Sequence, residues 1–320
     1  MKAKIIFHKS LFAKSLSLCT VFTIAIISVS VISAQKTFAD TASNGTPETT
    51  NSETITTPAS EQIIYVNPTT GADSASNGSS EESAYRTISF AIEQATPGTI
   101  IQLASGQYNT EKFPIVVKSG ITLRGNENSQ GEGIEVIGGG LYNSRTFARQ
   151  DITILTQGNA TISGLTVTNN NRRGTGIWVE SGQPIIQNNT FTSNKREGVF
   201  VTGKATPRIE NNRFVKNDAN GVSVTKQAGG EIRNNIFENT GFGIAIGGNS
   251  TPMVSNNKIY SNRNGIVLTD FAKPQILSNN IENNSDYGVV IIGQAKPNMD
   301  KNTFAGNQKK DMFQAVPYSE

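Results

Sequence analysis

A repeat of 22 to 23 residues constrains this chain more than any other feature. From residue 176 onwards, glycines recur at this interval, and each one precedes an apolar–any–apolar triplet such as Ile177 to Val179. Further apolar, asparagine and aromatic rows keep the same register. Such a short period predicts a solenoid in which each unit packs only on its neighbours. The glycine row is Gly176, Gly198, Gly221, Gly243, Gly265 and Gly288, and the asparagine row is Asn189, Asn212, Asn235, Asn257, Asn279 and Asn302.

The residue types within each unit favour short strands. Apolar residues two positions apart indicate strands of three to five residues with one buried face. Like residues would stack about 4.8 Å apart on adjacent strands, so Phe191, Phe214 and Phe237 should form an interior stack. Asparagines tolerate left-handed turns, and their amides can hydrogen-bond from coil to coil. The fold class predicted is an all-β, single-stranded right-handed parallel β-helix of about ten coils.

The segment before the regular repeats predicts a cap. A strand at 63–66 and a polar loop at 67–83 precede Ile88, Ala91, Ile92 and Ala95, whose spacing is that of an amphipathic helix. We expect this helix to cover the first coil. Looser strands are expected at 115–117, 121–123, 134–137, 152–155 and 162–167, with an insertion loop at 138–150.

The N-terminus has the pattern of an export signal. Four lysines precede an apolar stretch from Leu18 to Ala34, and Thr37-Phe38-Ala39 resembles a cleavage site. An uncleaved membrane anchor is the alternative, because the apolar stretch approaches the length that spans a bilayer. The domain organisation expected is therefore a signal peptide at 1–39, a disordered Thr/Ser-rich linker at 40–61, a cap region with one helix at 62–110, β-helix coils at 111–310 and a C-terminal tail at 311–320.

Signal cleavage changes the chemistry that the chain can carry. Residues 1–39 hold five lysines and no acidic residue, so their removal takes the net charge from +3 to −2. We therefore expect no nucleic-acid partner and, after cleavage, no membrane partner. The single cysteine (Cys19) and the single histidine (His8) also leave with the signal. The expected product is a secreted, periplasmic or envelope monomer without a disulfide.

Two resemblances follow from these residues. The repeats from about 100 to 310 resemble the parallel β-helix repeats of the pectin lyase-like superfamily. The N-terminal block contains Tyr65-Val66-Asn67-Pro68, Gly71, Asp73, Tyr85-Arg86-Thr87-Ile88, Gly106-Gln107-Tyr108, Phe113-Pro114 and Gly120 to Leu123 with Gly125. With these residues it resembles the bacterial domain-of-unknown-function 1565 family, which implies a secreted β-helix and no particular activity.

The acidic residues give little support to catalysis. Relatives with this fold often act on acidic polysaccharides, but calcium-assisted elimination needs several convergent carboxylates, and here the acids are scattered singly. No cofactor or metal is therefore expected, and calcium binding is left undecided. The catalytic candidates are Lys195, Arg196 and Glu197 before Gly198, with Arg149 and Asp151 from the insertion side; the alternative is a solvated corner.

An outward-facing apolar ladder is more distinctive. The residue between the two inward positions after each glycine is Trp178, Phe200, Ser223, Ala245, Val267 or Val290. Trp178 and Phe200 would form a flat aromatic step of the kind that sugar rings lie against. Alternatively, the insertion loop, with Tyr142 and Phe147, would fold over the ladder and bury it. The candidate ligand-binding residues are Trp178, Phe200, Tyr142 and Glu180.

These observations favour a non-catalytic exported β-helix that binds a glycan or envelope polysaccharide or serves as a structural surface module. The competing function class is a polysaccharide lyase, epimerase or hydrolase that acts on acidic sugars. A convergent acid cluster with a basic residue in a groove would favour the enzyme, and an uncharged aromatic strip would favour binding.

Overall fold

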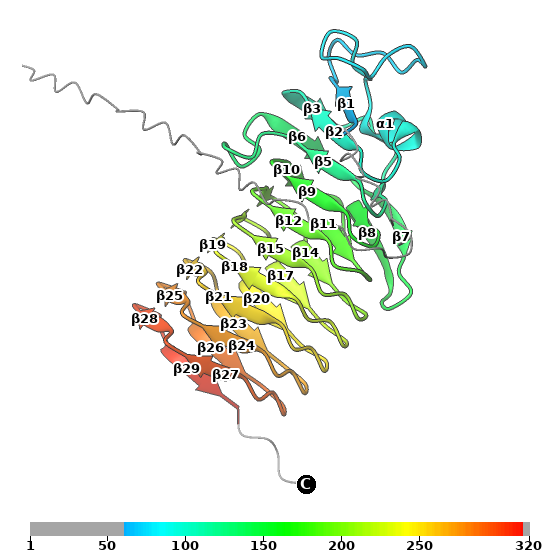
Figure 1. Cartoon of the computed structure of the whole chain (residues 1–320). Helices are drawn as coiled ribbons and strands as arrows, with labels where there is room; N and C mark the ends of the chain where they lie inside the picture. The colour runs from blue at the N-terminus through cyan, green and yellow to red at the C-terminus, as the bar shows by residue number, and fades with distance from the viewer. Residues whose placement is uncertain (1–60, 316–320) are drawn as a thin grey trace, which may run out of the picture. The chain divides into compact units, whose positions relative to one another are not determined.

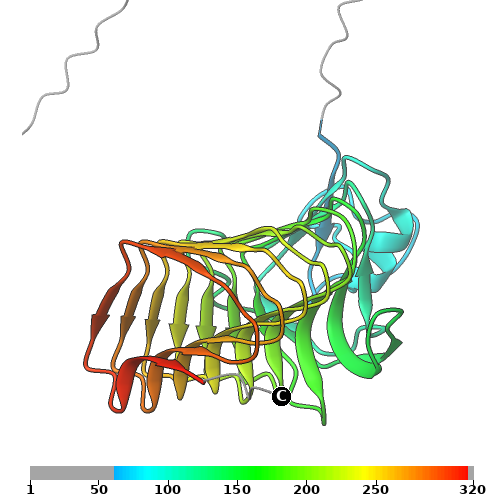
Figure 2. The same ribbon diagram turned by 90° about the horizontal axis from the view of Figure 1, so that it is seen from below.

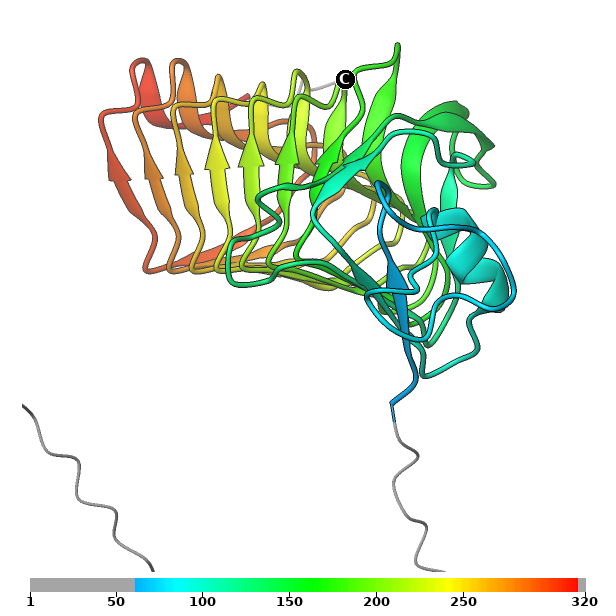
Figure 3. The same ribbon diagram turned by 90° about the horizontal axis from the view of Figure 1, so that it is seen from above.

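The computed structural model describes residues 61–315, which form a right-handed parallel β-solenoid of about nine turns (Figure 1). The predicted signal and nearly all of the predicted linker lie outside the described residues. Each turn contributes one strand to each of three sheets, and the coils stack in parallel rows (Figures 2 and 3). The predicted fold class is confirmed. Within residues 61–315, no helix is long and apolar enough to cross a bilayer.

The three sheets are each built from strands of successive coils. Sheet A comprises β1 (Ile63–Val66), β2 (Ile100–Leu103), β5 (Thr122–Arg124), β9 (Thr161–Ser163), β12 (Ile185–Gln187), β15 (Arg208–Glu210), β18 (Glu231–Arg233), β21 (Met253–Ser255), β24 (Gln275–Leu277) and β27 (Asn298–Asp300). Sheet B comprises β3 (Gly106–Tyr108), β6 (Ile134–Ile137), β10 (Thr166–Thr168), β13 (Thr190–Thr192), β16 (Arg213–Val215), β19 (Ile236–Glu238), β22 (Lys258–Tyr260), β25 (Asn280–Glu282) and β28 (Thr303–Ala305). Sheet C comprises β4 (Ile115–Val117), β8 (Arg149–Thr156), β11 (Gly174–Val179), β14 (Glu197–Val201), β17 (Asn220–Val224), β20 (Phe242–Ile246), β23 (Asn264–Leu268), β26 (Tyr287–Ile291) and β29 (Lys310–Gln314), with β7 (Gly140–Asn143) pairing antiparallel to β8.

The predicted phenylalanine stack lies in the core. The ring centroids of Phe191 and Phe214 are 4.9 Å apart, those of Phe214 and Phe237 are 4.7 Å apart, and all three side chains are fully buried. This stack also explains the glycine row. A Cβ at Gly221 would lie 2.4 Å from Cδ1 of Phe237, so the aromatic ring occupies the space that any larger residue would need.

The asparagine row forms the predicted ladder, with one correction. The side-chain amide of Asn212 donates to Oδ1 of Asn235 at 3.0 Å, and the row continues in this way from Asn189 to Asn302. The left-handed φ, however, belongs to the preceding residue of each turn, as at Asn211 (φ 57°). The ladder residues recur in register along the chain because they satisfy buried backbone carbonyls, such as that of Ile186.

A second ladder was missed at the opposite end of each sheet B strand. Asn194 donates to Asn217 at 2.8 Å, and Asn262 donates to Asn284 at 3.2 Å. Thr240 takes the place of asparagine at the third position of this row, after Asn217, and its hydroxyl donates a hydrogen bond to Asn262. The same 22- to 23-residue spacing carries this row, so the signal was present in the sequence.

The predicted helix is present as α1 (Ile88–Gln94) at the N-terminal end of the solenoid (Figures 1 and 2). Ile88, Ala91 and Ile92 are buried, and the helix packs against β1, β2 and β4. Thr87 caps it by accepting a hydrogen bond from the amide of Phe90, and the Glu111 carboxylate accepts from the amide of Ile88.

Several predicted boundaries need correction. The strand expected at 121–123 lies one residue later, and the one expected at 162–167 divides into β9 and β10 at Gly164, whose φ is +68°. The insertion at 138–150 is not a loop alone, because β7 and the start of β8 form a hairpin. Strands β2 and β3 of the expected cap region already belong to the solenoid sheets, and β29 lies in the expected tail. The ends of such short strands depend on hydrogen bonds to the strands of adjacent coils, so they are difficult to predict from the sequence of one coil.

Candidate functional site

The predicted outward ladder runs along sheet C in a single register. Trp178 pairs with Phe200, Phe200 with Ser223, and Ser223 with Ala245 on successive strands. The row continues through Val267 and Val290 to Phe313 in β29. Because strands of a parallel sheet present matching positions on one face, these side chains share one outer surface of the solenoid.

The hairpin of β7 and β8 covers the large aromatic part of this ladder. Trp178 is fully buried and Phe200 is 4% exposed; their rings stack 4.3 Å apart within a small cluster that includes Ile152 and Leu155. The ring of Phe147 lies edge-on to Phe200 with a centroid distance of 5.2 Å. The aromatic stacking is therefore present, and of the two interpretations the structure has the covered one. Ligand binding by Trp178, Phe200, Tyr142 and Glu180 stays a prediction.

Glu180 fastens the hairpin to sheet C. Its carboxylate accepts hydrogen bonds from the hydroxyls of Tyr142 (2.6 Å) and Thr146 (2.9 Å), and a short one from Ser144. Burial by itself would raise the pKa of Glu180, but the hydrogen bonds from Ser144, Tyr142 and Thr146 outweigh it and lower the pKa to about 2. Burial and the carboxylate of Glu180 together raise the pKa of Tyr142 to about 12. Glu180 is thus ionised at neutral pH and holds the hairpin down.

Beyond the hairpin, the outer face of sheet C is hollowed into a groove of about 270 Å³, here called the sheet C groove. Its floor consists of the small ladder residues Ser223 and Ala245, followed by Val267. The two long sides and the end next to the hairpin carry aromatic rings, hydroxyls, amides and charges. The lining residues outside the floor are Phe147, Arg196, Glu197, Phe200, Asn220, Val224, Thr225, Phe242, Ile246, Gly247, Thr269 and Asp270.

The charged turn predicted before Gly198 is divided between solvent and groove. Lys195 is exposed and pairs with Asp218 on the next coil at 2.6 Å, as the alternative of a solvated corner predicts. Arg196 instead binds Oε1 of Glu197 at 2.9 Å and Oε1 of Gln150 at 2.6 Å. Glu197 is 2% exposed, and burial raises its pKa even though Arg196 and the hydroxyl of Thr175 oppose this effect. Arg196 and Glu197 therefore form a fixed polar corner at the end of the groove.

The other two catalytic candidates lie apart from this corner. Asp151 accepts hydrogen bonds from the amides of Asn169 (3.0 Å) and Asn171 (3.3 Å), which gives it a role in the turn before β11. Arg149 is the exposed first residue of β8. Within residues 61–315, no hydrogen bond or ion pair joins either residue to Lys195, Arg196 or Glu197. Gln150, which lies between them in sequence, makes that connection instead and was missed.

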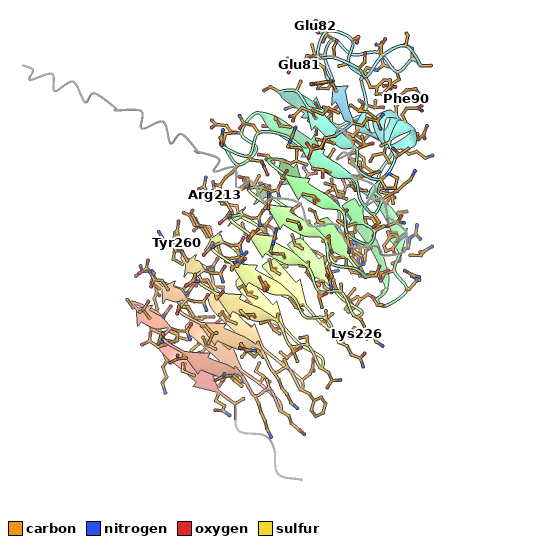
Figure 4. All side chains as sticks on the ribbon, in the orientation of Figure 1. Glu81, Glu82, Phe90, Arg213, Lys226 and Tyr260 are labelled. Atoms are coloured by element: carbon orange, nitrogen blue, oxygen red, sulfur yellow. The ribbon has the colours of Figure 1, made fainter. Side chains whose placement is uncertain are left out.

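A basic margin borders the groove on the side of the turns that follow the sheet C strands. A second, shallow depression of about 790 Å³ there is lined by Lys204, Lys226 and Asp270, together with Arg145 and Thr146 from the hairpin. Figure 4 shows Lys226 on this edge, whereas Arg213 and Tyr260 project from the other side of the solenoid. In the described part of the chain, no three Asp, Glu, His or Cys side chains converge as they would around a metal ion.

The fold and the groove together define a right-handed parallel β-helix protein. The family model of the right-handed β-helix region matches residues 115–228 and 175–314, so that the two matches together span residues 115–314 and overlap at 175–228. The chain belongs to this family.

Solved structures show the same fold at low sequence identity. The pectate lyase Pel9A is 15% identical, with 80% of this chain and 78% of that chain covered and a TM-score of 0.60. The complex of XylC with xylose is 11% identical, with 75% and 70% covered and a TM-score of 0.54. No curated protein sequence matches the chain significantly. These likenesses show the fold and leave the activity to be argued from the groove.

Proposed function

We propose that the sheet C groove binds a segment of a polysaccharide and that the protein is a non-catalytic glycan-binding module of the cell envelope. The observation that carries this proposal is the composition of the groove lining. The partly exposed rings of Phe147 and Phe242 lie among hydroxyl and amide groups, while the buried ring of Phe200 lies beneath Phe147. Sugar rings present apolar CH faces and a rim of hydroxyls, and such a mixed lining offers a partner for each.

The shape of the groove also suits a polymer. It runs across successive strands, parallel to the solenoid axis, and its floor positions repeat every coil, about 4.8 Å apart. A polysaccharide repeats along its axis in the same manner, so that successive sugars meet similar surroundings. The lysines of the neighbouring margin, Lys204 and Lys226, favour a polymer that carries negative charge.

The proposal includes export of the protein to the cell envelope. The N-terminal signal pattern and the resemblance to the domain-of-unknown-function 1565 family support secretion, and an envelope location would expose the groove to polysaccharides. The charge distribution supports the absence of a nucleic-acid partner, and a monomer without a cofactor remains our expectation. Calcium would not be needed for binding of this kind.

The test is binding to a panel of neutral and acidic polysaccharides by isothermal titration calorimetry, with and without calcium. The double variant Ser223→Leu with Ala245→Leu raises the floor of the groove on two adjacent coils. Its matched control, Ser255→Leu with Gln275→Leu, adds the same side chains to outward positions on adjacent coils of sheet A. We expect the floor variant to lose at least ten-fold in affinity and the control to bind as the parent does. Equal binding by both variants would exclude this groove as the binding surface.

One observation favours the second candidate, a polysaccharide-active enzyme. Glu197 lines the groove, and burial raises its pKa, as is required of a carboxyl that donates a proton. Incubation of the bound polymer with the protein and with its Glu197→Gln variant distinguishes the two functions. New reducing ends or unsaturated products that only the parent protein forms would establish the enzyme.

A further inference from the structure

The sheet C groove ends abruptly at the hairpin. Along the outward row, the large side chains of Trp178 and Phe200 give way to Ser223 and Ala245. Phe147 lies against the outer face of Phe200, and it remains 41% exposed. The surface therefore rises by one aromatic layer between the strand β17 and the strand β14.

This step is rigidly built. The amide of Phe147 donates to the hydroxyl of Ser144 at 2.9 Å, and Ser144 in turn binds the carboxylate of Glu180. The Phe147 ring also packs edge-on against Trp178, with the centroids 6.3 Å apart. The backbone of Phe147 is therefore anchored through Ser144 to Glu180, and its ring packs on two other aromatic rings. We expect Phe147 to keep its position when a ligand binds.

The closed end also carries a positively charged group that is held in place. The guanidinium of Arg196 is held by Gln150 and Glu197 and lies 6.0 Å from the centroid of the Phe200 ring. Arg145 and Thr146, from the same hairpin tip, border the adjoining basic depression. In the opposite direction, the floor continues over Val267 and Val290, and the next aromatic side chain of the row, Phe313, lies three coils beyond Ala245, on the last strand β29.

From this one-sided closure we infer that the groove recognises the end of a glycan chain. The terminal sugar lies against Phe147 and Arg196, and the chain extends over Ser223, Ala245 and Val267 towards β26. An internal segment of the glycan chain would have to pass over the ring of Phe147, and it would then lose contact with the floor residues of the groove. This inference rests on the proposed function and specifies it, since it names chain termini as the ligand.

The experiment uses the polysaccharide that gives the strongest signal in the binding panel. Samples of equal mass are fragmented to decreasing chain lengths, and the binding capacity of each is measured by calorimetry with the full-length protein. Recognition of termini predicts that the amount of protein bound per unit mass of polysaccharide rises in proportion to the number of chain ends. Blocking one kind of end with a bulky label should lower the affinity at least ten-fold, and blocking the other should have little effect.

The Phe147→Ala variant should reduce this preference for ends, because it lowers the step. Leu141→Ala is the control, since Leu141 is an exposed apolar residue (61%) of the same hairpin that lines neither the groove nor the basic depression. A capacity that depends on mass alone, with end-blocked chains bound equally well, would overturn the inference and leave glycan binding intact. Failure of every polysaccharide in the panel to bind would overturn both.

Discussion

Trp178 and Phe200 stack on adjacent coils with their ring centroids 4.3 Å apart and their planes within 2° of parallel. Both belong to an outward row, yet neither is open to solvent, because Phe147 and Tyr142 of the hairpin cover them. The solenoid thus has a second small apolar cluster outside its main core. This cluster joins the hairpin to sheet C and determines where the sheet C groove begins.

The first prediction concerns this cluster. The emission of Trp178, the single tryptophan of the chain, should be blue-shifted and poorly quenched by acrylamide. Phe147→Ala should increase quenching and lower the free energy of unfolding by about 1 kcal/mol, the usual value of an aromatic contact. Phe271→Ala, which truncates an exposed phenylalanine (51%) outside the cluster, should change neither quantity. Unchanged quenching in Phe147→Ala would show that Phe147 does not protect the cluster.

The second prediction concerns pH. The pKa of Glu180 falls from its ordinary value of 4.5 to about 2 in the folded protein, so its contribution to stability is complete above about pH 4.5. It is lost as the pH falls from there through 2, when Tyr142 and Thr146 lose their anionic acceptor. Acrylamide quenching of Trp178 should therefore rise over this range. Glu180→Gln should show high quenching already at neutral pH and a flatter profile; a profile identical to that of the parent would contradict the assignment.

The third prediction concerns the glycine row. Gly221→Ala would place a Cβ 2.4 Å from Phe237, so we expect a loss of about 1 to 3 kcal/mol in the free energy of unfolding. Gly229→Ala is the matched control, because its Cβ would meet no atom closer than 3.5 Å. That control should be neutral or slightly stabilising. Denaturant unfolding measures both, and equal effects would rule out the packing explanation.

The fourth prediction concerns the first asparagine ladder. Asn212→Ala removes the side-chain hydrogen bonds to Asn235 and to the carbonyl of Ile186, and it leaves the backbone amide of Asn189 without its acceptor. Buried polar groups without partners cost about 1 to 3 kcal/mol each, so a loss of at least ~3 kcal/mol is expected. Asn211→Gly, one residue earlier, keeps the left-handed turn and should cost less than ~1 kcal/mol. A ladder residue no more sensitive than its neighbour would contradict this account.

The regular coils could be predicted from the sequence because every structural requirement recurs there. Phe214 packs between aromatic rings of the two adjacent coils, and Asn212 bonds to amides at the equivalent positions of those coils. Gly221 must leave space for the ring of Phe237. Each requirement appears at a constant spacing, so the rows are legible without a structure. The second ladder, which includes Asn217, obeys the same rule and could have been found in the same way.

The sequence by itself therefore determined the solenoid, its register and the helix at its N-terminal end, since these depend on local patterns and on contacts between equivalent positions. Only the tertiary structure decided which part of the outward row is open. Phe147, Tyr142 and Gln150 lie in an insertion that occurs once, and their contacts with Phe200, Glu180 and Arg196 join positions 38 to 53 residues apart with no repeating signal. The covered cluster, the fixed corner at Arg196 and the groove beyond them follow from the way this single hairpin folds onto a surface that the repeats had already formed.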